Sequence, residues 1–408
     1  MRTDALVLGA ELDGLVAALR LLERGLSVRL IAAGGGALHY APGGLHLLGY
    51  GAGNGAAPLT EPFASIDALG TKHPLRLLGV PRVRLALDWF LRQAGDLGLA
   101  FRSNGGNDLA VTLAGQAVPV FAQARHQATF ADLDGQRVAV VSIDGYRDFP
   151  AGMTVAELGR QGIDARLLRV EPPGDGADSL RLARALDAQP AAAAFFESLR
   201  ARLPEGSARV LFPAILGLDR HEEVVAAAER ILGMPCLEVP TLPPSLPGLR
   251  LGRALTGRLR RRGAVLHMGA RAVGVAAANG SCKAVRDDGE RSFEAGVFIL
   301  ATGGVLMGGL DVDSHGLVRE PLFGLEVAQT RPLSAERVDG ALDALHETGV
   351  ETDECLRPLA GGEPAFDNLF VTGRTLAHWN PARESSAEGV AIATGWAAAE
   401  EACAYLGV

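Results

Sequence analysis

The N-terminal segment changes its hydrophobic period twice. Ala5–Leu8 is a short apolar run that ends at Gly9, and between Leu12 and Leu22 apolar residues recur at helical spacing. Gly25 then precedes a second apolar run, Ser27–Ile31. A strand, a glycine turn, a helix and a strand in this order predict a βαβ nucleotide-binding unit. Such a unit favours phosphate because unpaired N–H groups and the positive end of the dipole lie at the helix N-terminus.

The glycine turn departs from the usual Gly-x-Gly-x-x-Gly pattern at its middle position. Gly9 permits the tight turn and Gly14 permits close helix packing, but Glu11 stands where a glycine would let a pyrophosphate approach. A carboxylate about 4 Å from a phosphate charge costs about 4 kcal/mol at an effective dielectric of 20. Ala32 and Ala33 occupy the end of the second strand, where an acidic residue would hold the adenosine ribose. Both changes fall on the adenosine half of a dinucleotide.

Further along, residues 260–304 predict a small antiparallel layer. Short apolar segments alternate with turns at Asn279-Gly280 and Asp287-Asp288-Gly289. The segment ends in the apolar strand 297–300, followed by Ala301-Thr302-Gly303. A strand that ends in Ala-Thr-Gly after such a meander is similar to the second signature of flavoproteins of the two-dinucleotide-binding type.

The C-terminal region predicts a strand, a loop and a long helix. Asn368–Thr372 is a strand that reaches Gly373, and a helix is expected from about Ala387 to Ala404. Flavoproteins of this kind use such a segment to hold the ribityl chain and to aim a helix N-terminus at the flavin ring. Their residue after the glycine is typically Asp, whereas here it is Arg374, which can only donate hydrogen bonds and suits a phosphate better.

A glycine-rich loop, residues 36–48, follows the second predicted strand and contains His39 and His46. Small residues in this place let a flat ring lie against the backbone. We consider His39 as a base or a flavin contact, and His46 as a weaker candidate, against the alternative that both are ordinary structural histidines.

Composition narrows the class of protein. The chain has 408 residues, enough for two domains, and a net charge of −8, which argues against a nucleic-acid-binding surface. The four cysteines are scattered singly, so no iron–sulfur or zinc cluster is expected and no metal ligands are predicted. The longest apolar stretch, residues 296–310, is shorter than the roughly 20 residues that span a bilayer. We expect a cytoplasmic protein that reaches the inner face of the membrane only through partners.

Several segments together resemble the B subunit of the anaerobic glycerol-3-phosphate dehydrogenase. The resemblance extends over nearly the whole chain. The matching residues are Ala37-Leu38-His39, Gly43, Leu45, Leu47-Leu48, His73-Pro74, Leu77-Leu78-Gly79, Phe212–Leu218, Thr241–Gly248, Asn380-Pro381-Ala382-Arg383 and Gly389-Val390. The sequence departs from the family pattern at Glu11, Pro42, Arg374 and Ser386.

The resemblance implies a flavin-containing subunit that works beside an FAD-containing A subunit and a membrane-attached iron–sulfur C subunit. Together they oxidise the small-molecule substrate sn-glycerol 3-phosphate to dihydroxyacetone phosphate and pass electrons toward quinone. The family's B subunit is usually assigned FMN, which fits the altered adenosine half; FAD is the alternative cofactor.

The expected fold is α/β, a Rossmann-like FAD/NAD(P)-binding fold with a small antiparallel layer and an inserted α+β domain. Residues 1–60, 248–315 and 365–408 are predicted to form the flavin domain, and residues 61–247 with 316–364 the substrate or subunit-interface domain. His39 and Arg383 are the predicted catalytic residues. The predicted cofactor-binding residues are Gly9, Ala10, Gly14, Ala37, Leu38, His39, Gly43, Gly44, Ala301, Thr302, Gly303, Gly373, Arg374, Gly389 and Val390.

Two other functions stay open at this point. Glu11 and Arg374 motivate a cofactor-poor scaffold subunit that docks the catalytic and iron–sulfur subunits. A free-standing FAD-dependent reductase is the other, and activity without partners would distinguish it. The sequence does not decide whether the chain oxidises the substrate itself, nor which oligomer it forms.

Overall fold

A computed structural model describes residues 2–51, 56–176, 178–329, 331–333 and 341–408. The chain separates into two compact units. Unit 1 contains residues 1–37, 46–98 and 252–408, and unit 2 contains residues 38–45 and 99–251. The predicted flavin domain left out residues 61–98 and 316–364, which the structure groups with unit 1. Helix α2 (Pro74–Asp96) explains the first difference, because it packs against the C-terminal helix of the same unit.

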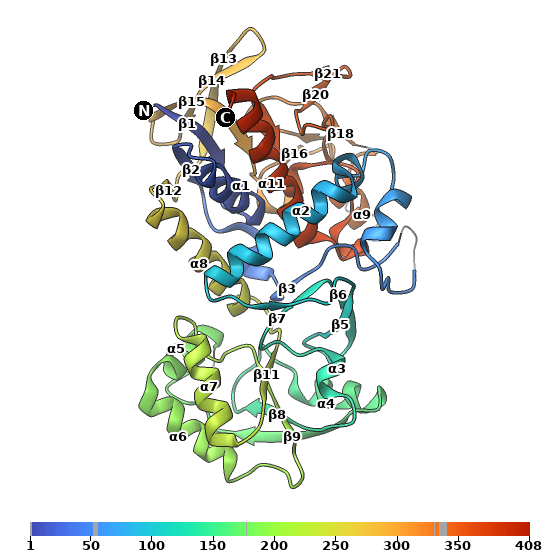
Figure 1. Cartoon of the computed structure of the whole chain (residues 1–408), viewed down its shortest axis with the longest axis vertical. Helices are drawn as coiled ribbons and strands as arrows, with labels where there is room; N and C mark the ends of the chain where they lie inside the picture. The colour runs from blue at the N-terminus through green and yellow to red at the C-terminus, as the bar shows by residue number, and fades with distance from the viewer. Residues whose placement is uncertain (1, 52–55, 177, 330, 334–340) are drawn as a thin grey trace. The chain divides into compact units, whose positions relative to one another are not determined.

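Unit 1 is built on a sheet with the strand order β12-β2-β1-β15-β14-β13, and β22 pairs with β15 (Figure 1). The strands β12, β2, β1, β15 and β22 run parallel to their neighbours, and β13 and β14 form the antiparallel layer beside β15. The bounds are β1 Arg2–Leu8, β2 Val28–Ala32, β12 Val265–Met268, β13 Ala272–Ala278, β14 Ser281–Asp287, β15 Ser292–Leu300 and β22 Leu369–Val371. Apolar side chains that are buried in β1 and β15 account for the continuous apolar runs in the sequence.

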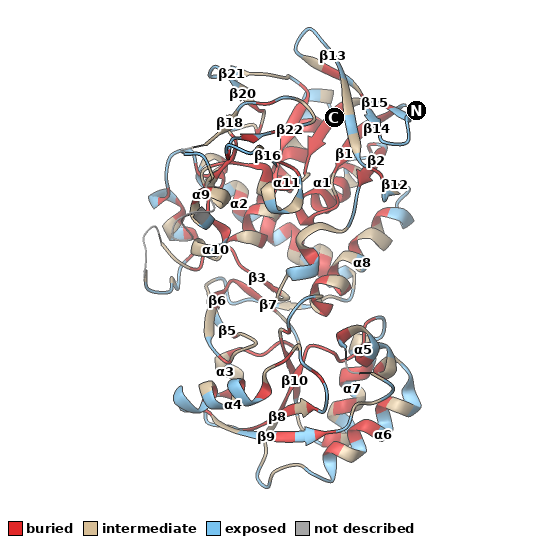
Figure 2. Ribbon diagram, turned by 180° about the vertical axis from the view of Figure 1, so that it is seen from behind, coloured by how far each residue is buried: buried red, intermediate tan, exposed pale blue. Residues whose placement is uncertain are grey.

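Two helices from opposite ends of the sequence pack side by side in unit 1. Helix α1 (Leu12–Glu23) contacts α11 (Ala387–Leu406), and α11 also contacts α2 (Figure 1). Glycine makes this approach possible: a Cβ built on Gly395 would lie 2.3 Å from the carbonyl oxygen of Asp13. The middle of α11 is largely buried (Figure 2), which is why its sequence from Gly389 to Ala399 is almost wholly apolar.

Helix α8 (Leu246–Arg261) and the 3-10 helix η1 (Gly36–Tyr40) each have residues in both units. The remaining elements of unit 1 are short. Its helices are η2 Phe63–Ala68, η3 Val305–Met307, α9 Ala341–Glu347, η4 Gly373–Thr375 and α10 Pro381–Glu384. Its small strands are β16 Asp311–Val312, β17 Val318–Arg319, β18 Val327–Ala328, β19 Gly349–Val350, β20 Leu359–Ala360 and β21 Glu363–Pro364.

Unit 2 has its own parallel sheet, with the strand order β11-β10-β8-β9. The strands are β8 Arg137–Ile143, β9 Asp164–Val170, β10 Arg209–Pro213 and β11 Cys236–Val239. The helices that connect or flank them are α3 Phe130–Leu133, α4 Ala151–Arg160, α5 Ser179–Asp187, α6 Gln189–Arg200 and α7 His221–Leu232. Apolar residues from these strands and helices form one core (Figure 2).

Small antiparallel sheets complete unit 2. They are formed by β3 Gly44–Leu45, β4 Phe101–Arg102, β5 Asp108–Val111, β6 Ala117–Val120 and β7 Ala122–Ala124. The sequence predicted an inserted α+β domain in this region, without its individual strands and helices. Among the described residues, no helix has the length and apolar character needed to cross a membrane.

Candidate functional site

Three parallel strands of unit 1 end side by side, and a cavity lies at that edge. Leu8 of β1 is in register with Ile31 of β2 and with Leu300 of β15, so the turns that follow these strands meet. The cavity has a volume of about 410 Å³. Its walls are residues 8–11, 31–34, 36, 270–273, 301–302, 307–309, 311 and 320–322. Ligands of open α/β sheets bind outside the carboxyl ends of the strands, where this cavity lies.

The glycines of the first turn sit where no side chain fits. Gly9 has a φ of 120°, and a Cβ built on it would lie 1.8 Å from the carbonyl oxygen of Ala301. A Cβ on Gly14 would lie 2.5 Å from the carbonyl oxygen of Gly9 and 3.1 Å from the Cβ of Ala301. The turn therefore lets α1 begin directly against the end of β15, which leaves its first amides facing the cavity edge.

Glu11 occupies the middle of this turn and points into the site. It is 6% exposed and is the residue before α1, but its side chain does not cap the helix. A Cβ built on Gly36 would lie 2.4 Å from the Cγ of Glu11, and one built on Gly303 would lie 2.7 Å from its Oε1. The carboxylate thus lies between the loop after β2 and the loop after β15. Its Oε1 has no hydrogen-bond partner among the described residues, while the Ala37 amide donates to the carboxylate.

Burial changes the acidity of two carboxyl groups at this turn. Burial raises the pKa of Glu11 to about 7; the nearby Asp13 charge adds to the rise, and Arg374 opposes it. Burial also raises the pKa of Asp13 to about 6, against the hydrogen bond from the Thr372 hydroxyl at 2.7 Å. Glu11 is therefore protonated in a large part of the molecules near neutral pH.

The residues of the cavity fit a nucleotide when Glu11 is protonated. Ala32, Ala33 and Gly34 line the cavity with small side chains, which leaves room for an adenosine beyond the turn. The Oγ1 of Thr302 is buried without a hydrogen-bond partner among the described residues, so it can bond to a ligand. A protonated Glu11 is a donor to a phosphate oxygen, whereas its anion repels the phosphate.

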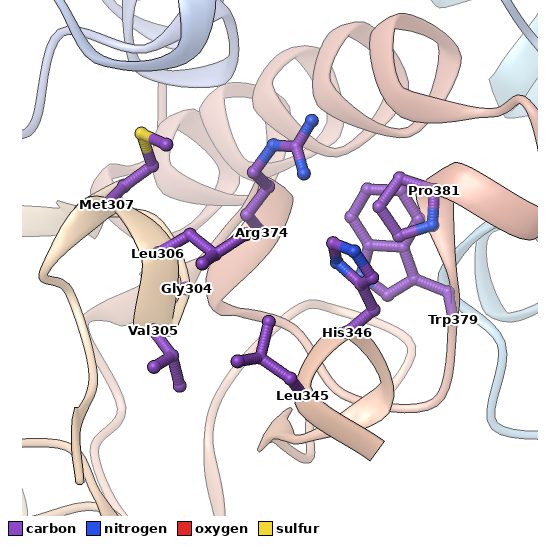
Figure 3. A pocket seen from close by; sticks show the side chains of 9 residues that line it. All are labelled: Gly304, Val305, Leu306, Met307, Leu345, His346, Arg374, Trp379 and Pro381. Carbon is purple, nitrogen blue, oxygen red and sulfur yellow. The ribbon is translucent and has the colours of Figure 1, made fainter. Parts of the chain in front are cut away.

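A smaller cavity, of about 20 Å³, lies beside Arg374 (Figure 3). Arg374 follows β22, and His346 comes from α9; both side chains line this space together with Trp379. Burial, with the charge of Arg374, lowers the pKa of His346, so its imidazole is neutral at physiological pH. Arg374 is also the cation that acts on both Glu11 and Asp13.

The N-terminus of α11 holds a buried, hydrogen-bonded pair of a histidine and a carboxylate. The Nδ1 of His46 lies 3.0 Å from the Oε2 of Glu388, and both side chains are nearly inaccessible. Burial opposes ionisation of Glu388, but the hydrogen bond and charge of His46 outweigh it and lower the pKa of Glu388. The predicted residue Gly389 lies next to this pair, since its Cβ would be 2.6 Å from the Cα of Leu47.

A second histidine and carboxylate pair involves His73 and Glu384. The Nδ1 of His73 accepts from the Leu75 amide at 3.1 Å, so in the neutral ring Nε2 carries the proton. That Nε2 lies 3.0 Å from the Oε2 of Glu384, to which the Ser386 hydroxyl also donates. The amide of Asn380 donates to the other oxygen of Glu384. Both carboxylate oxygens of Glu384 therefore have hydrogen-bond partners.

The two predicted catalytic residues have different surroundings. Arg383 of α10 pairs with Asp343, and its Nη1 lies 3.7 Å from the Oε1 of Glu347. The guanidinium is thus already engaged with two carboxylates of α9. His39 lies in η1 within unit 2 and is exposed, and its carbonyl accepts from the Ser245 amide.

The predicted cofactor residues divide between the units. Gly9, Ala10, Ala301 and Thr302 line the large cavity, and Gly14, Gly303 and Gly373 pack against the same turn. Ala37, Arg374, Gly389 and Val390 belong to unit 1 as well, whereas Leu38, His39, Gly43 and Gly44 belong to unit 2.

Sequence reasoning missed Glu384, Glu388 and His346 as members of the buried polar groups. Their partners are distant in the sequence: His46 and Glu388 are 342 positions apart, and His73 and Glu384 are 311 apart. The one available signal was the charge of Glu388 just before the apolar stretch of the final helix.

Comparison with known proteins identifies the relatives of this chain. The family described as "FAD binding domain" matches residues 4–390. A protein of Halobacterium salinarum, named as the probable B subunit of an anaerobic glycerol-3-phosphate dehydrogenase, is 34% identical, covering 98% of this chain and 97% of that protein. The protein of Yersinia pseudotuberculosis that is named as the B subunit of the same enzyme is 30% identical over 100% of both chains.

Among solved structures, a flavocytochrome c3 fumarate reductase aligns with 99% of this chain and with 78% of the reductase chain, at 11% identity and a TM-score of 0.47. That likeness is too weak to support an argument. The family match names FAD, so the expectation of FMN as the cofactor is not supported. The chain belongs to the FAD binding domain family and, within it, to the relatives named as B subunits of anaerobic glycerol-3-phosphate dehydrogenase.

Proposed function

We propose that this chain is the B subunit of an anaerobic glycerol-3-phosphate dehydrogenase that binds FAD. It oxidises sn-glycerol 3-phosphate to dihydroxyacetone phosphate and passes electrons toward quinone through an FAD-containing A subunit and an iron–sulfur C subunit. The observation that carries the proposal is the cavity at the carboxyl edge of β1, β2 and β15, which the glycine turn borders. The substrate is inferred from the names of relatives that align with 98–100% of the chain.

The cavity supports FAD rather than a shorter flavin nucleotide. Its walls continue past the turn to Ala32, Ala33 and residues 270–273, which is more room than a single phosphate needs. In this proposal the amides of Ala10 and the first turn of α1 hold the diphosphate, and Thr302 adds a hydroxyl. A bound flavin supplies an acceptor for the hydride that leaves C2 of the substrate.

The chain's own residues would set the charge of this site. Protonated Glu11 donates to a phosphate oxygen, and Arg374 offsets negative charge next to it. His39 is the proposed base for the hydroxyl proton, since its imidazole is exposed. Arg383 is the proposed partner of an anionic group, a role in which it would have to exchange its present pairing with Asp343.

A second function has a specific observation in its favour. The carboxyl group of Glu11 lies between Gly36 and Gly303. Above pH 7 this group is mostly ionised, and its negative charge would repel a diphosphate bound there. A protein that keeps this group ionised would bind no flavin and would dock the other two subunits instead.

Reconstitution with flavin separates the two functions. The purified chain is incubated with FAD or FMN, desalted, and its visible spectrum is recorded before and after anaerobic addition of sn-glycerol 3-phosphate. FAD that the chain retains after desalting supports the proposal, and bleaching by sn-glycerol 3-phosphate only when the A and C subunits are present excludes a free-standing reductase. If no flavin is retained although the chain co-purifies with both of these subunits, the scaffold function is correct.

The base is tested in the same assay. His39→Ala is expected to retain FAD but to slow bleaching by about 10²–10⁴-fold, the usual contribution of a general base. Bleaching at the wild-type rate would remove His39 from the reaction.

A further inference from the structure

Unit 2 contains a cluster of two histidines and one carboxylate apart from the cavity described above. His126 follows β7, and His221 and Glu222 are the first residues of α7. Each offers one nitrogen or oxygen atom, and these three atoms lie within 4.8 Å of one another. The rings of His126 and His221 meet edge to face, with 5.4 Å between their centroids.

The backbone holds the two ligand-bearing segments in fixed positions. The carbonyl of His126 accepts from the Glu238 amide at 2.7 Å, so this turn is joined to β11. Gln127 forms a parallel bridge with the same residue of β11. His221 is fixed by its place in the first turn of α7. The cluster therefore joins the edge of the parallel sheet to the start of a helix.

One hydrogen bond orients the imidazole of His221 as a metal ligand. The Nδ1 of His221 lies 2.7 Å from the carbonyl oxygen of Leu216. A carbonyl only accepts, so Nδ1 carries the hydrogen and Nε2 has a free lone pair. Histidines that bind metals commonly donate their second N–H to a backbone carbonyl in this way, which fixes the tautomer and the orientation of the ring.

The side chains of His126 and Glu222 already contact each other. The Nε2 of His126 lies 3.0 Å from the Oε2 of Glu222, and the Glu222 side chain is 49% exposed. A cation entering here would replace the proton on Nε2 of His126, which would move to Nδ1 or to solvent. Glu222 can turn toward the ion at little cost because its side chain reaches into water.

The nearby positive charge is largely compensated. Arg250 is buried and pairs with Glu238, with 2.7 Å between Nη1 and Oε2, so the two charges offset each other. Arg125 is exposed to solvent, which screens its effect on Glu222.

We propose that His126, His221 and Glu222 bind one divalent transition-metal ion, for which Zn²⁺ is the best match. Two imidazoles and one carboxylate suit Zn²⁺, whereas Mg²⁺ and Ca²⁺ prefer oxygen ligands alone. Zinc bonds of about 2.0–2.2 Å require donor atoms about 3.3 Å apart. The Nε2 of His126 and the Oε2 of Glu222, 3.0 Å apart, are already near this spacing, and the donor atom of His221 lies within 4.8 Å of the other two. One position of the ion stays open toward solvent. The bound ion fastens α7 to the turn at His126.

This site does not depend on the flavin function. All its residues lie in unit 2, and metal binding is measured on the full chain without FAD or substrate. The chain is stripped with a chelator, and Zn²⁺ alone is titrated by calorimetry. Co²⁺ is then added to record the visible bands of a tetrahedral site.

Three variants and one control test the assignment. His126→Ala and His221→Ala are expected to lose the tight equivalent of Zn²⁺, with affinity at least about tenfold weaker. Glu222→Gln removes an exposed carboxylate and is expected to weaken binding without affecting folding. His315→Ala is the control, because His315 is exposed and lies in unit 1.

The pattern of zinc binding across these variants decides the matter. The site is supported if the wild type and His315→Ala bind one equivalent, the two histidine variants lose it and Glu222→Gln binds it more weakly. If Glu222→Gln and a folded histidine variant bind Zn²⁺ as the wild type does, the proposal is wrong. Wild-type binding only at millimolar Zn²⁺ would overturn it too.

Discussion

Two of the places where unit 1 buries carboxyl groups treat the negative charge in opposite ways. At the first glycine turn Glu11 has an unpartnered oxygen, and burial raises its pKa to about 7. At the start of α11, Glu388 is similarly inaccessible, yet His46 lowers its pKa. Burial is common to both, so the partner decides the charge. A buried carboxyl oxygen without a hydrogen-bond partner marks a place that a ligand or a proton can complete.

The largest effect is expected from breaking the partnered pair. His46→Ala removes the imidazole that lowers the pKa of Glu388 and leaves the buried carboxylate with backbone hydrogen bonds alone, which should cost about 3–5 kcal/mol of unfolding free energy. Denaturant unfolding measures it. Adding Glu388→Gln to that variant should restore part of the loss, because it removes the orphaned charge.

The control for this pair is an exposed one. Lys72 lies 2.8 Å from Glu351, and its side chain is 61% exposed. Lys72→Ala should cost less than about 1 kcal/mol. Equal losses for His46→Ala and Lys72→Ala would show that the His46 pair is not a buried charge pair.

The unpartnered acid should make stability depend on pH. The pKa of Glu11 is about 7 in the folded chain, against an ordinary 4.5, so the folded chain holds this proton more tightly. The contribution of this tighter proton binding to the free energy of unfolding is complete below pH 4.5 and is lost as the pH rises from 4.5 toward 7. Glu11→Gln keeps a neutral side chain at every pH.

The free energy of unfolding of Glu11→Gln, measured relative to that of the wild type, should therefore increase by about 2–3 kcal/mol as the pH rises from 5 to 8. Glu61→Gln, at an exposed position, is the control and should show no such trend. A constant difference between Glu11→Gln and wild type across this range would contradict the raised pKa.

Packing at the glycine turn gives a smaller effect. The Cβ introduced by Gly14→Ala would lie 2.5 Å from the Gly9 carbonyl oxygen, so α1 must shift, at about 1–3 kcal/mol. Gly95→Ala lies in α2, where a Cβ meets no atom within 4 Å, and should be neutral or stabilising. Thermal unfolding compares the two; a stabilised Gly14→Ala would mean that the turn is looser than described.

The smallest effect concerns Arg374. Its charge lowers the pKa of Glu11 and of Asp13, so Arg374→Ala should raise both pKa values further. The pH at which Glu11 loses its proton moves upward, and the stability changes by less than about 1 kcal/mol. The pH profile of unfolding detects the shift; a downward shift would exclude Arg374 as the compensating cation.

The sequence predicts the parts of unit 1 that depend on local pattern. The βαβ unit, the antiparallel layer and the final helix follow from apolar spacing and from turns such as Asn279-Gly280. Glu11 was recognised because it replaces a glycine in a short motif. Pairs such as His46 with Glu388 leave no local trace, since the fold brings together residues 342 positions apart.

The same limit applies to unit 2. The scattered cysteines of the whole chain predicted no metal cluster, and spacing cannot show that the Nε2 of His126 and the Oε2 of Glu222, in residues 96 positions apart, lie 3.0 Å from each other. The domain boundaries also depended on packing that spacing does not reveal, because α2 joins unit 1 by contact with α11.

The most direct test of the nucleotide site is the dissociation constant of FAD at pH 6 and pH 8, measured by fluorescence for the wild type and for Glu11→Gln. Because the anion of Glu11 repels a diphosphate, wild-type affinity should fall about tenfold between these values, while Glu11→Gln changes little. Equal pH dependence in both proteins would remove Glu11 from the binding site. Failure of both to bind FAD at either pH would contradict the nucleotide cavity itself.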